Sequence, residues 1–209
     1  MITAAALELV RRGDLDAVTL RKVAERLDTG PASLYVYVAN REELLERMLD
    51  QVLLEVPMVR VQTRSWEARL VELFSGMLEA LNRYSGIAHV GLGSVPSGPG
   101  QLRISENALA LFESGGIPDQ PAAWATDALL LYTFANAVEY AIERRRMPTA
   151  PQHKSPETDY VGWLRDLYSS LPENEYPHLT RMAVTLTTGD DAERFEFGLR
   201  ALIRGAHGD

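Results

Sequence analysis

Residues 18 to 45 constrain this chain most, because they contain two short helical patterns joined by a tight turn. Thr19 is a suitable N-cap for a first helix from about Leu20 to Leu27, whose apolar residues recur at helical spacing. Gly30 closes the turn, and Pro31 follows at the first position of a second helix, where its missing N–H does no harm. The stretch therefore predicts a helix-turn-helix.

The second helix of this motif is expected to be buried on one side only. Leu34 and Val38 lie four residues apart and should face inward. The remaining side chains are left at its exposed front end or along its outer side: Pro31, Ala32, Ser33, Tyr35, Val36 and Tyr37. An exposed second helix of this kind reads base edges in DNA-binding helix-turn-helix proteins, so the pattern indicates DNA recognition.

Three short motifs in this stretch resemble the tetracycline-repressor (TetR) family of bacterial transcriptional regulators. They are T-x-R-x-V-A from Thr19, L-Y-x-Y-V from Leu34 and N-R-E-E-L-L from Asn40. In the family the turn usually begins with Gly, whereas this chain has Asp28, a residue that can still adopt the left-handed conformation. The resemblance implies a dimeric regulator that binds double-stranded operator DNA.

By position, the resemblance also implies which residues meet the DNA. Those at the phosphate backbone are Thr19, Leu20 and Arg21, which open the first helix of the motif, and Arg41, which starts the next helix. Those of the recognition helix are Gly30, Pro31, Ala32, Ser33, Tyr35, Val36 and Tyr37.

The charge of the chain argues against a general attraction to DNA. The net charge is −8, and residues 1 to 56 hold 7 basic against 10 acidic side chains, whereas affinity for a polyanion comes largely from Lys and Arg. Contacts to DNA must therefore come from basic residues gathered at one place. Those near the helix ends expected at the DNA are Arg11, Arg12, Arg21, Lys22 and Arg41. A ligand-binding dimer that has lost DNA binding is therefore an open alternative.

Helical spacing continues along the chain and predicts an all-α protein. A helix at 41–56 joins an N-terminal three-helix DNA-binding domain, residues 1–46, to a larger helical bundle for ligand binding and dimerisation, residues 47–209. Further helices are expected at 65–84 (capped by Ser65), 87–90, 101–114, 119–146, 161–170 and 192–203. The glycine-rich stretch 91–100 is expected to be a connector, because it lacks the preceding strand and the Lys of a phosphate-binding loop.

Composition excludes several other classes of protein. No apolar run among the 209 residues is long enough to span a bilayer, so we expect a cytoplasmic protein with no membrane partner. The chain has no Cys and only four scattered His, and we expect no metal and no cofactor. A helical enzyme using Glu139 and His89 is the weaker alternative, since no nucleophile–base pair is recognisable at a known spacing, and we expect a protein that is not an enzyme.

The helix expected at 119–146 is apolar almost all round, so packing one of its faces against the core of its own chain cannot bury all of its apolar side chains. The final helix offers apolar partners, and two such helices from each of two chains would form a four-helix interface. G-x-P-D before the long helix and R-F-E-F-G-L in the final helix resemble the ligand-binding and dimerisation domain of the same family. The expected interface residues are Leu130, Phe134, Val138, Phe195, Leu199 and Leu202.

Side chains with an apolar body and a polar tip are frequent in the larger domain and are typical of small-molecule pockets. Tyr132, Asn136 and Tyr140 form one stripe of the long helix, where a ligand could satisfy Asn136. Plain core packing explains any one of these residues as well, so the set alone carries the prediction. The expected effector-binding residues are Trp66, Met77, Leu81, His89, Ile104, Asn107, Trp124, Leu131, Tyr132, Asn136, Tyr140 and Trp163. Together these patterns predict a repressor that a small molecule releases from its operator.

Overall fold

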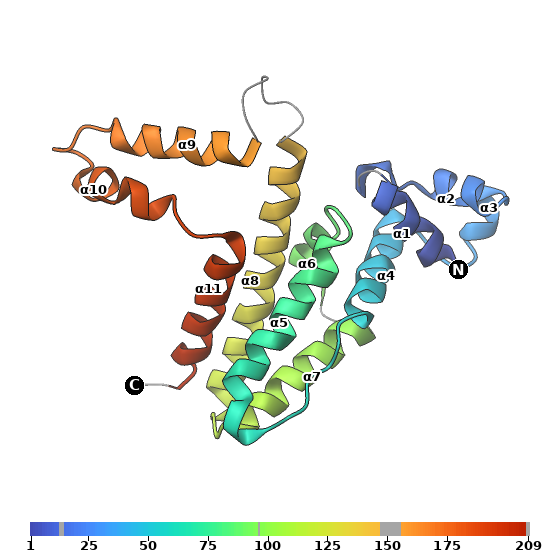
Figure 1. Cartoon of the computed structure of the whole chain (residues 1–209). Coiled ribbons are helices and arrows are strands. Elements are labelled where there is room, and N and C mark those ends of the chain that lie inside the picture. Colours follow the sequence, from blue (N-terminus) through green and yellow to red (C-terminus); the bar gives the residue numbers. More distant parts are fainter. Residues whose placement is uncertain (13–14, 96, 147–155, 208–209) are drawn as a thin grey trace. The chain divides into compact units, whose positions relative to one another are not determined.

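The computed structural model describes residues 1–12, 15–95, 97–146 and 156–207, which form helices and connecting turns without a strand (Figure 1). The chain divides into two compact units, Met1–Ala141 with Glu196–Asp209, and Ile142–Phe195. In the described ranges, no helix has both the length and the apolar character needed to cross a membrane.

The first unit begins with the head, which we define as α1 to α3. Its elements are α1 (Ile2–Arg12), η1 (Leu15–Ala17), α2 (Leu20–Arg26) and α3 (Pro31–Leu34). The elements that follow are α4 (Arg41–Leu54), η2 (Thr63–Ser65), α5 (Trp66–Asn82), α6 (Ala88–Gly93) and α7 (Pro99–Ser114). Two long helices, α8 (Asp119–Arg146) and α11 (Asp191–Gly205), begin or end in the second unit, which also contains α9 (Pro156–Ser169) and α10 (Pro177–Leu186).

Helix α4 connects the head to the rest of the first unit (Figure 1). It packs against α1 on the head and against α5, α6 and α7 in the larger bundle. Its apolar residues fall on more than one face, and all of them are buried: Leu44, Leu45, Met48, Leu49, Val52 and Leu53. Because α4 is buried on several sides, packing determines its position, and any shift of the helix would disturb more than one of its contact surfaces.

The largest buried side chains of the bundle come from α5, α7 and α8. Phe74, Phe112 and Phe134 are almost completely inaccessible, and so are Leu70, Leu73 and Met77 of α5. Burying a phenylalanine or leucine side chain stabilises the fold by roughly 1.5–3 kcal/mol relative to leaving it exposed. This core therefore supplies most of the driving force for the bundle.

Several helix boundaries differ from those expected. Helix α7 starts at Pro99 rather than at residue 101, because Gly98 occupies the N-cap position and Pro99 the first turn. Ser65 precedes α5, but its hydroxyl bonds to Gln62 Oε1 at 3.4 Å and caps no helical N–H. The expected side-chain cap is therefore wrong.

Two further differences concern whole segments. Helix α6 extends through Gly91 to Gly93, so the first part of the expected connector is helical. A Cβ at Gly91 would overlap the ring of Phe134, which shows that this glycine permits close packing. Helix α10 was not expected at all. Its N-cap residue, Tyr176, makes no side-chain capping bond, and its one start signal, Pro177 in the first turn, was missed.

Candidate functional site

The helix-turn-helix has the local geometry that its sequence predicts. Thr19 caps α2, because its Oγ1 accepts a hydrogen bond from the Lys22 N–H at 3.2 Å. Asp28 begins the turn with a φ of 51°, in the left-handed region, where the family usually has glycine. The Thr29 N–H closes the turn on the Ala24 carbonyl at 3.0 Å. An aspartate thus performs the conformational role of the missing glycine.

The second helix of the motif is regular over a shorter range than expected. Helix α3 spans Pro31–Leu34, and a hydrogen-bonded turn then continues, in which both the Tyr37 and Val38 N–H groups donate to the Leu34 carbonyl at 2.9 Å. Leu34 and Val38 are buried as expected. The exposed side chains of this stretch are Pro31, Ala32, Ser33, Tyr35, Val36 and Tyr37, which we call the recognition surface.

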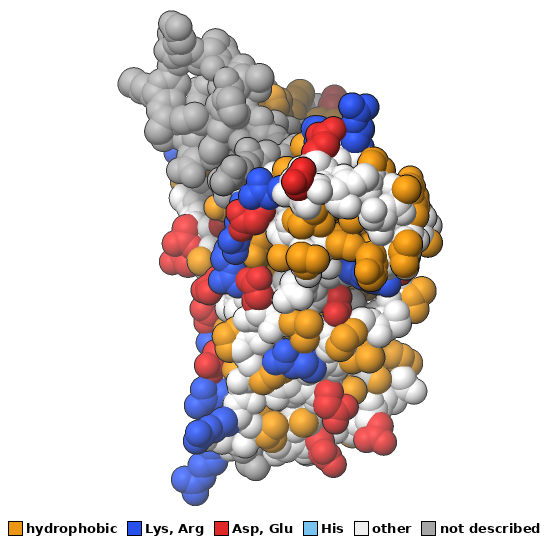
Figure 2. Space-filling model, turned by 90° about the vertical axis from the view of Figure 1, so that its right-hand side faces the viewer, with side chains coloured by type: hydrophobic (Ala, Val, Ile, Leu, Met, Phe, Trp, Pro, Cys, Tyr) orange, Lys and Arg blue, Asp and Glu red, His pale blue; other side chains and the backbone are white. Residues whose placement is uncertain are grey.

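The recognition surface is uncharged, whereas charged residues lie around it. Figure 2, which looks onto the head, shows hydrophobic side chains gathered there, with Lys, Arg, Asp and Glu side chains along one edge. Among the residues expected at phosphates, Thr19 and Arg21 are exposed and Leu20 is half-buried. Arg21 forms an exposed ion pair with Glu25 at 3.0 Å, which a phosphate can replace at little cost.

Arg41 performs a structural task in addition to the expected one. Its Nε donates to the Val18 carbonyl at 2.9 Å and its Nη2 to the Leu15 carbonyl at 3.2 Å. These bonds tie the start of α4 to the segment that leads into α2. Only part of the guanidinium is therefore available to a phosphate.

The end of the recognition surface is fastened to α4 by reciprocal caps. Asn40 Oδ1 accepts from the Glu43 N–H at 2.8 Å, and Glu43 Oε2 accepts from the Ala39 N–H at 2.6 Å. The hydrogen bond from Ala39, and next the one from Arg47, lowers the pKa of Glu43. The carboxylate is thus stabilised in its charged form directly after Tyr37 and Val38.

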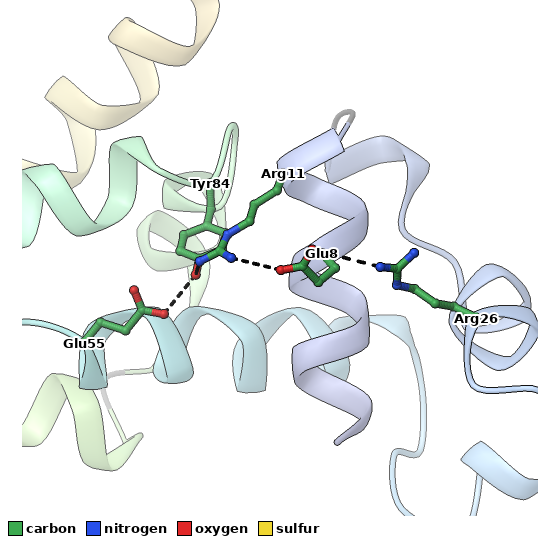
Figure 3. Close-up of polar contacts among 5 residues, drawn as sticks. All are labelled: Glu8, Arg11, Arg26, Glu55 and Tyr84. Carbon is green, nitrogen blue, oxygen red and sulfur yellow. Dashed lines mark hydrogen bonds and ion pairs between the residues drawn. The ribbon is translucent and has the colours of Figure 1, made fainter.

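Five polar side chains, which we call the Tyr84 network, join the head to α4 and α5 (Figure 3). Arg26 of α2 approaches Glu8 of α1 at 4.0 Å, and Glu8 pairs with Arg11 at 2.9 Å. Arg11 Nη2 donates to the Tyr84 hydroxyl at 2.7 Å, and this hydroxyl donates to Glu55 Oε1 at 2.9 Å. Burial and the bond to Glu55 raise the pKa of Tyr84, so the phenol stays protonated and bridges the two charges.

The Tyr84 network was not anticipated from the sequence. Arg11 is one of the basic residues expected near the DNA, and its guanidinium lies 4.9 Å from the centroid of the Tyr84 ring. The two residues are 73 positions apart, and no local pattern connects them. The side chain of Arg12, the neighbouring candidate, is outside the described residues.

A second polar connection holds α4 against the start of α7. Asp50 Oδ1 accepts from the Gly100 N–H at 2.6 Å, where the first turn of α7 has unpaired donors. A Cβ at Gly100 would lie 2.6 Å from the Asp50 carbonyl oxygen and 2.9 Å from Leu53 Cβ, so only glycine fits there. Arg103 adds a bond to the Leu54 carbonyl at 3.3 Å. The glycine-rich stretch therefore allows two backbones to approach each other.

The residues expected to bind an effector are distributed over several environments. Met77, Leu81 and Ile104 are core side chains, and Trp66 packs against Phe112 and His207 with ring centroids 5.7 and 5.3 Å apart. Tyr132 and Asn136 are half-buried, and those with exposed side chains are His89, Trp124, Leu131, Tyr140 and, in the second unit, Trp163. Their role in effector binding stays a prediction.

The two asparagines of this set already have hydrogen-bond partners. Asn107 bridges both backbone groups of Val59: its Oδ1 accepts from the N–H at 2.9 Å and its Nδ2 donates to the carbonyl at 3.1 Å. Asn136 Nδ2 donates to the Tyr132 carbonyl at 2.8 Å. Neither amide needs a ligand to compensate its burial. An unsatisfied Asn136 therefore gives no reason to expect a ligand beside it.

Comparison with known proteins identifies the family of this chain. The family model for bacterial regulatory proteins of the tetR family matches residues 2–48, and the model for the tetracyclin repressor-like C-terminal domain matches residues 61–207. The chain belongs to the TetR family. It is therefore a ligand-responsive transcriptional regulator, and its family is regulatory rather than enzymatic.

Relatives of this TetR-family chain match over nearly its full length. It is similar to the class D tetracycline repressor of Escherichia coli, with 28% identity over 204 residues, covering 96% of this chain and 85% of the relative. The chain is also similar to the repressor DrrR1 of Streptomyces coeruleorubidus, with 26% identity over an alignment that covers 98% of this chain and 75% of DrrR1. Apo ActR from Streptomyces coelicolor has a TM-score of 0.85 at 30% identity, covering all of this chain and 97% of that one. The predicted fold, a helix-turn-helix head followed by a helical ligand-binding domain, is confirmed.

TetR-family regulators work as homodimers. The side chains that α8 and α11 expose in a single chain are not mainly the ones expected at a dimer interface. Leu130, Phe134, Phe195 and Leu199 are buried within the chain, so they have little surface to offer a second copy, while Val138 and Leu202 are half-buried. Phe134 is turned inward because Gly91 gives its ring space. The large apolar side chains that the described residues of α8 and α11 expose are Trp124, Leu131, Tyr140, Ile142 and Phe197.

Proposed function

We propose that this TetR-family chain is a repressor that binds a two-fold symmetric operator as a homodimer and leaves it when a small molecule occupies the larger bundle. Two recognition surfaces, one from each copy, would then enter the major groove about 34 Å apart, one turn of DNA. Such a protein acts where bacterial DNA is, in the cytoplasm. Membership of the TetR family supports both parts of this proposal, because the family models match a DNA-binding domain and a repressor-like C-terminal domain.

The observation that carries the proposal is the exposed recognition surface on a helix-turn-helix whose first helix is capped by Thr19. Val36 is 79% exposed, and both flanking tyrosines are exposed as well. Large apolar and aromatic side chains usually lie inside a folded domain, and an exposed group of them marks an interaction site. Its position on the second helix of the helix-turn-helix and on the turn that follows this helix supports DNA as the partner.

The homodimer is supported by apolar side chains on the outer faces of the two long helices. Trp124 is 69% exposed on α8 and Phe197 is 76% exposed on α11, and Leu131 lies seven residues after Trp124 on the same stripe. Helices of this kind associate as a four-helix bundle between two copies. We propose Trp124, Leu131 and Phe197 as the centre of the interface in place of the buried residues.

Release by an effector requires a helix that both the ligand-binding bundle and the head contact, and α4 meets this condition. An effector can shift the equilibrium only if it binds the DNA-incompetent arrangement more tightly. The ActR structure at 31% identity contains actinorhodin, and a TetR variant from Acinetobacter baumannii AYE at 25% identity contains minocycline. These two molecules are the first probes for this chain.

The decisive experiment measures binding of the purified protein to duplexes that tile the DNA upstream of its own gene, with excess competitor DNA. A competitor-resistant site with two-fold symmetry is the expected result. Adding actinorhodin or minocycline to the complex then tests release. If no duplex binds, even at low salt, the protein is a ligand-binding dimer without a DNA role.

A further inference from the structure

The recognition surface lacks the side chains that most DNA-binding proteins use to identify guanine and adenine. Between residues 30 and 39 there is no Arg, Lys, Asn, Gln, Asp or Glu. Asn40 follows, but its Oδ1 caps α4 through the Glu43 N–H at 2.8 Å. Arg and Lys pair bidentately with guanine, and Asn and Gln with adenine. A bidentate base contact is therefore unavailable from this surface.

The recognition surface offers methyl groups instead. Ala32 lies in α3 and Val36 in the turn that follows it, where the Tyr37 and Val38 N–H groups both bond to the Leu34 carbonyl at 2.9 Å. Residues four apart lie on one side of a helical turn. Both side chains are exposed, and they give the recognition surface a small apolar strip.

Only one chemical group in the major groove matches an apolar strip. Each base pair presents hydrogen-bond donors and acceptors there, and only thymine adds a methyl group, at C5. Placing Val36 against a donor or acceptor would remove water from that group without replacing its hydrogen bond, which is unfavourable. Contact with a thymine methyl has no such penalty and excludes water from both partners.

We propose that the Ala32–Val36 strip reads the operator by contact with a thymine methyl group in each half-site. The proposal rests on the proposed function and adds the chemical class of the base contact. The hydroxyls of Ser33, Tyr35 and Tyr37 accept or donate hydrogen bonds and adapt to more than one base, so they contribute less discrimination. Arg21 and Lys22, exposed on α2, supply phosphate contacts, which position the head without reading sequence.

The test removes the methyl group and leaves the rest of the base unchanged. An operator is first obtained by selecting duplexes from a random pool with the full chain. Each thymine of the selected half-site is then replaced by deoxyuracil in turn, at both symmetric positions. One buried methyl corresponds to about a fourfold change in affinity, so a symmetric replacement at the critical position should weaken binding about fifteenfold.

Two valine variants separate the contact from general effects. In Val36→Ala, the same deoxyuracil replacement should weaken binding less than twofold, because the partner of the methyl group is gone. Val95→Ala is the matched control: Val95 is 80% exposed in the loop before α7, against 79% for Val36. It should keep the full sensitivity to deoxyuracil. Neither variant removes buried side-chain area, so both should fold.

The outcomes distinguish this proposal from the proposed function. If a specific operator is selected and no thymine replacement weakens binding, methyl readout is wrong and operator binding stands. The proposal also fails if Val36→Ala retains the wild-type sensitivity. If the pool yields no specific duplex at all, the proposed function fails, and the readout fails with it.

Discussion

Arg11 of α1 donates a hydrogen bond to the hydroxyl of Tyr84, at the end of α5, with a distance of 2.7 Å. The pair joins the helix that supports the recognition motif to the helix that begins the ligand-binding bundle. Tyr84 in turn donates to Glu55, directly after α4. Head, linking helix and bundle therefore meet at one phenolic oxygen.

Tyr84→Phe should destabilise the protein by about 1–3 kcal/mol, because the ring stays in place while Arg11 and Glu55 lose the hydroxyl that bridges them. Urea unfolding followed by circular dichroism measures the change. Tyr176→Phe, at an exposed tyrosine of the second unit, is the control and should unfold like the wild type. Equal stability of Tyr84→Phe and wild type would show that the bridge contributes nothing.

Gly100→Ala should destabilise the contact between α4 and α7 by roughly 1–3 kcal/mol, since the new Cβ would collide with the Asp50 carbonyl and Leu53. Gly93→Ala is a matched change, because a Cβ there meets nothing within 4 Å. Thermal unfolding of both variants is the measurement. A stability for Gly100→Ala as high as that of Gly93→Ala would contradict the close approach.

Glu43→Gln should reduce stability at neutral pH and make no difference in acid. The hydrogen bond from Ala39 lowers the pKa of Glu43 below its ordinary value of 4.5 in the folded protein. The carboxylate therefore stabilises the fold above about pH 4.5, and this contribution disappears as the pH falls through the folded pKa. Unfolding free energies of both proteins at pH 7 and pH 3 test this; a constant difference between them would refute it.

Tyr37→Ala should weaken operator binding by about 1–3 kcal/mol for each base or phosphate interaction that the substitution removes. The side chain is exposed, so folding should be unchanged. Fluorescence anisotropy with the selected operator measures the affinity, and Tyr176→Ala provides the comparison outside the head. An operator affinity equal to that of the wild type would remove Tyr37 from the recognition surface.

Leu131→Arg should convert the dimer to monomers, because it places a charge in the apolar centre of the proposed interface. Leu102→Arg makes the same change at an exposed leucine of α7 and should leave the dimer intact. Sedimentation velocity at micromolar concentration distinguishes the two states. A dimeric Leu131→Arg protein would place the interface elsewhere.

The helix-turn-helix could be predicted closely from the sequence, because its signals are local. The Thr19 cap, the Asp28 turn and the first-turn proline each act within four residues, and the inward positions of Leu34 and Val38 follow from helical spacing. The short regular length of α3 was not predicted, although the residues after Leu34, Tyr-Val-Tyr-Val, are weak helix formers.

The helices of the larger bundle were predictable from the sequence, but which side of each helix is buried was not. Periodicity could not assign the sides of α8, because apolar residues surround this helix and several faces look alike. The burial of Phe134 depends on Gly91 of a different helix, because the Phe134 ring occupies the space that a Cβ at Gly91 would take. Contacts between distant segments, such as Arg11 with Tyr84, have no periodic signature and appear only in three dimensions.

The burial of α4 also has a consequence for gene control. Met48 and Val52 are fully enclosed, and closely packed side chains exchange one arrangement for another rather than deforming gradually. Each dimer should therefore be either on its operator or off it. An intermediate dose of inducer would then set the fraction of dimers that occupy their operators, rather than weaken operator binding by every dimer to the same partial extent.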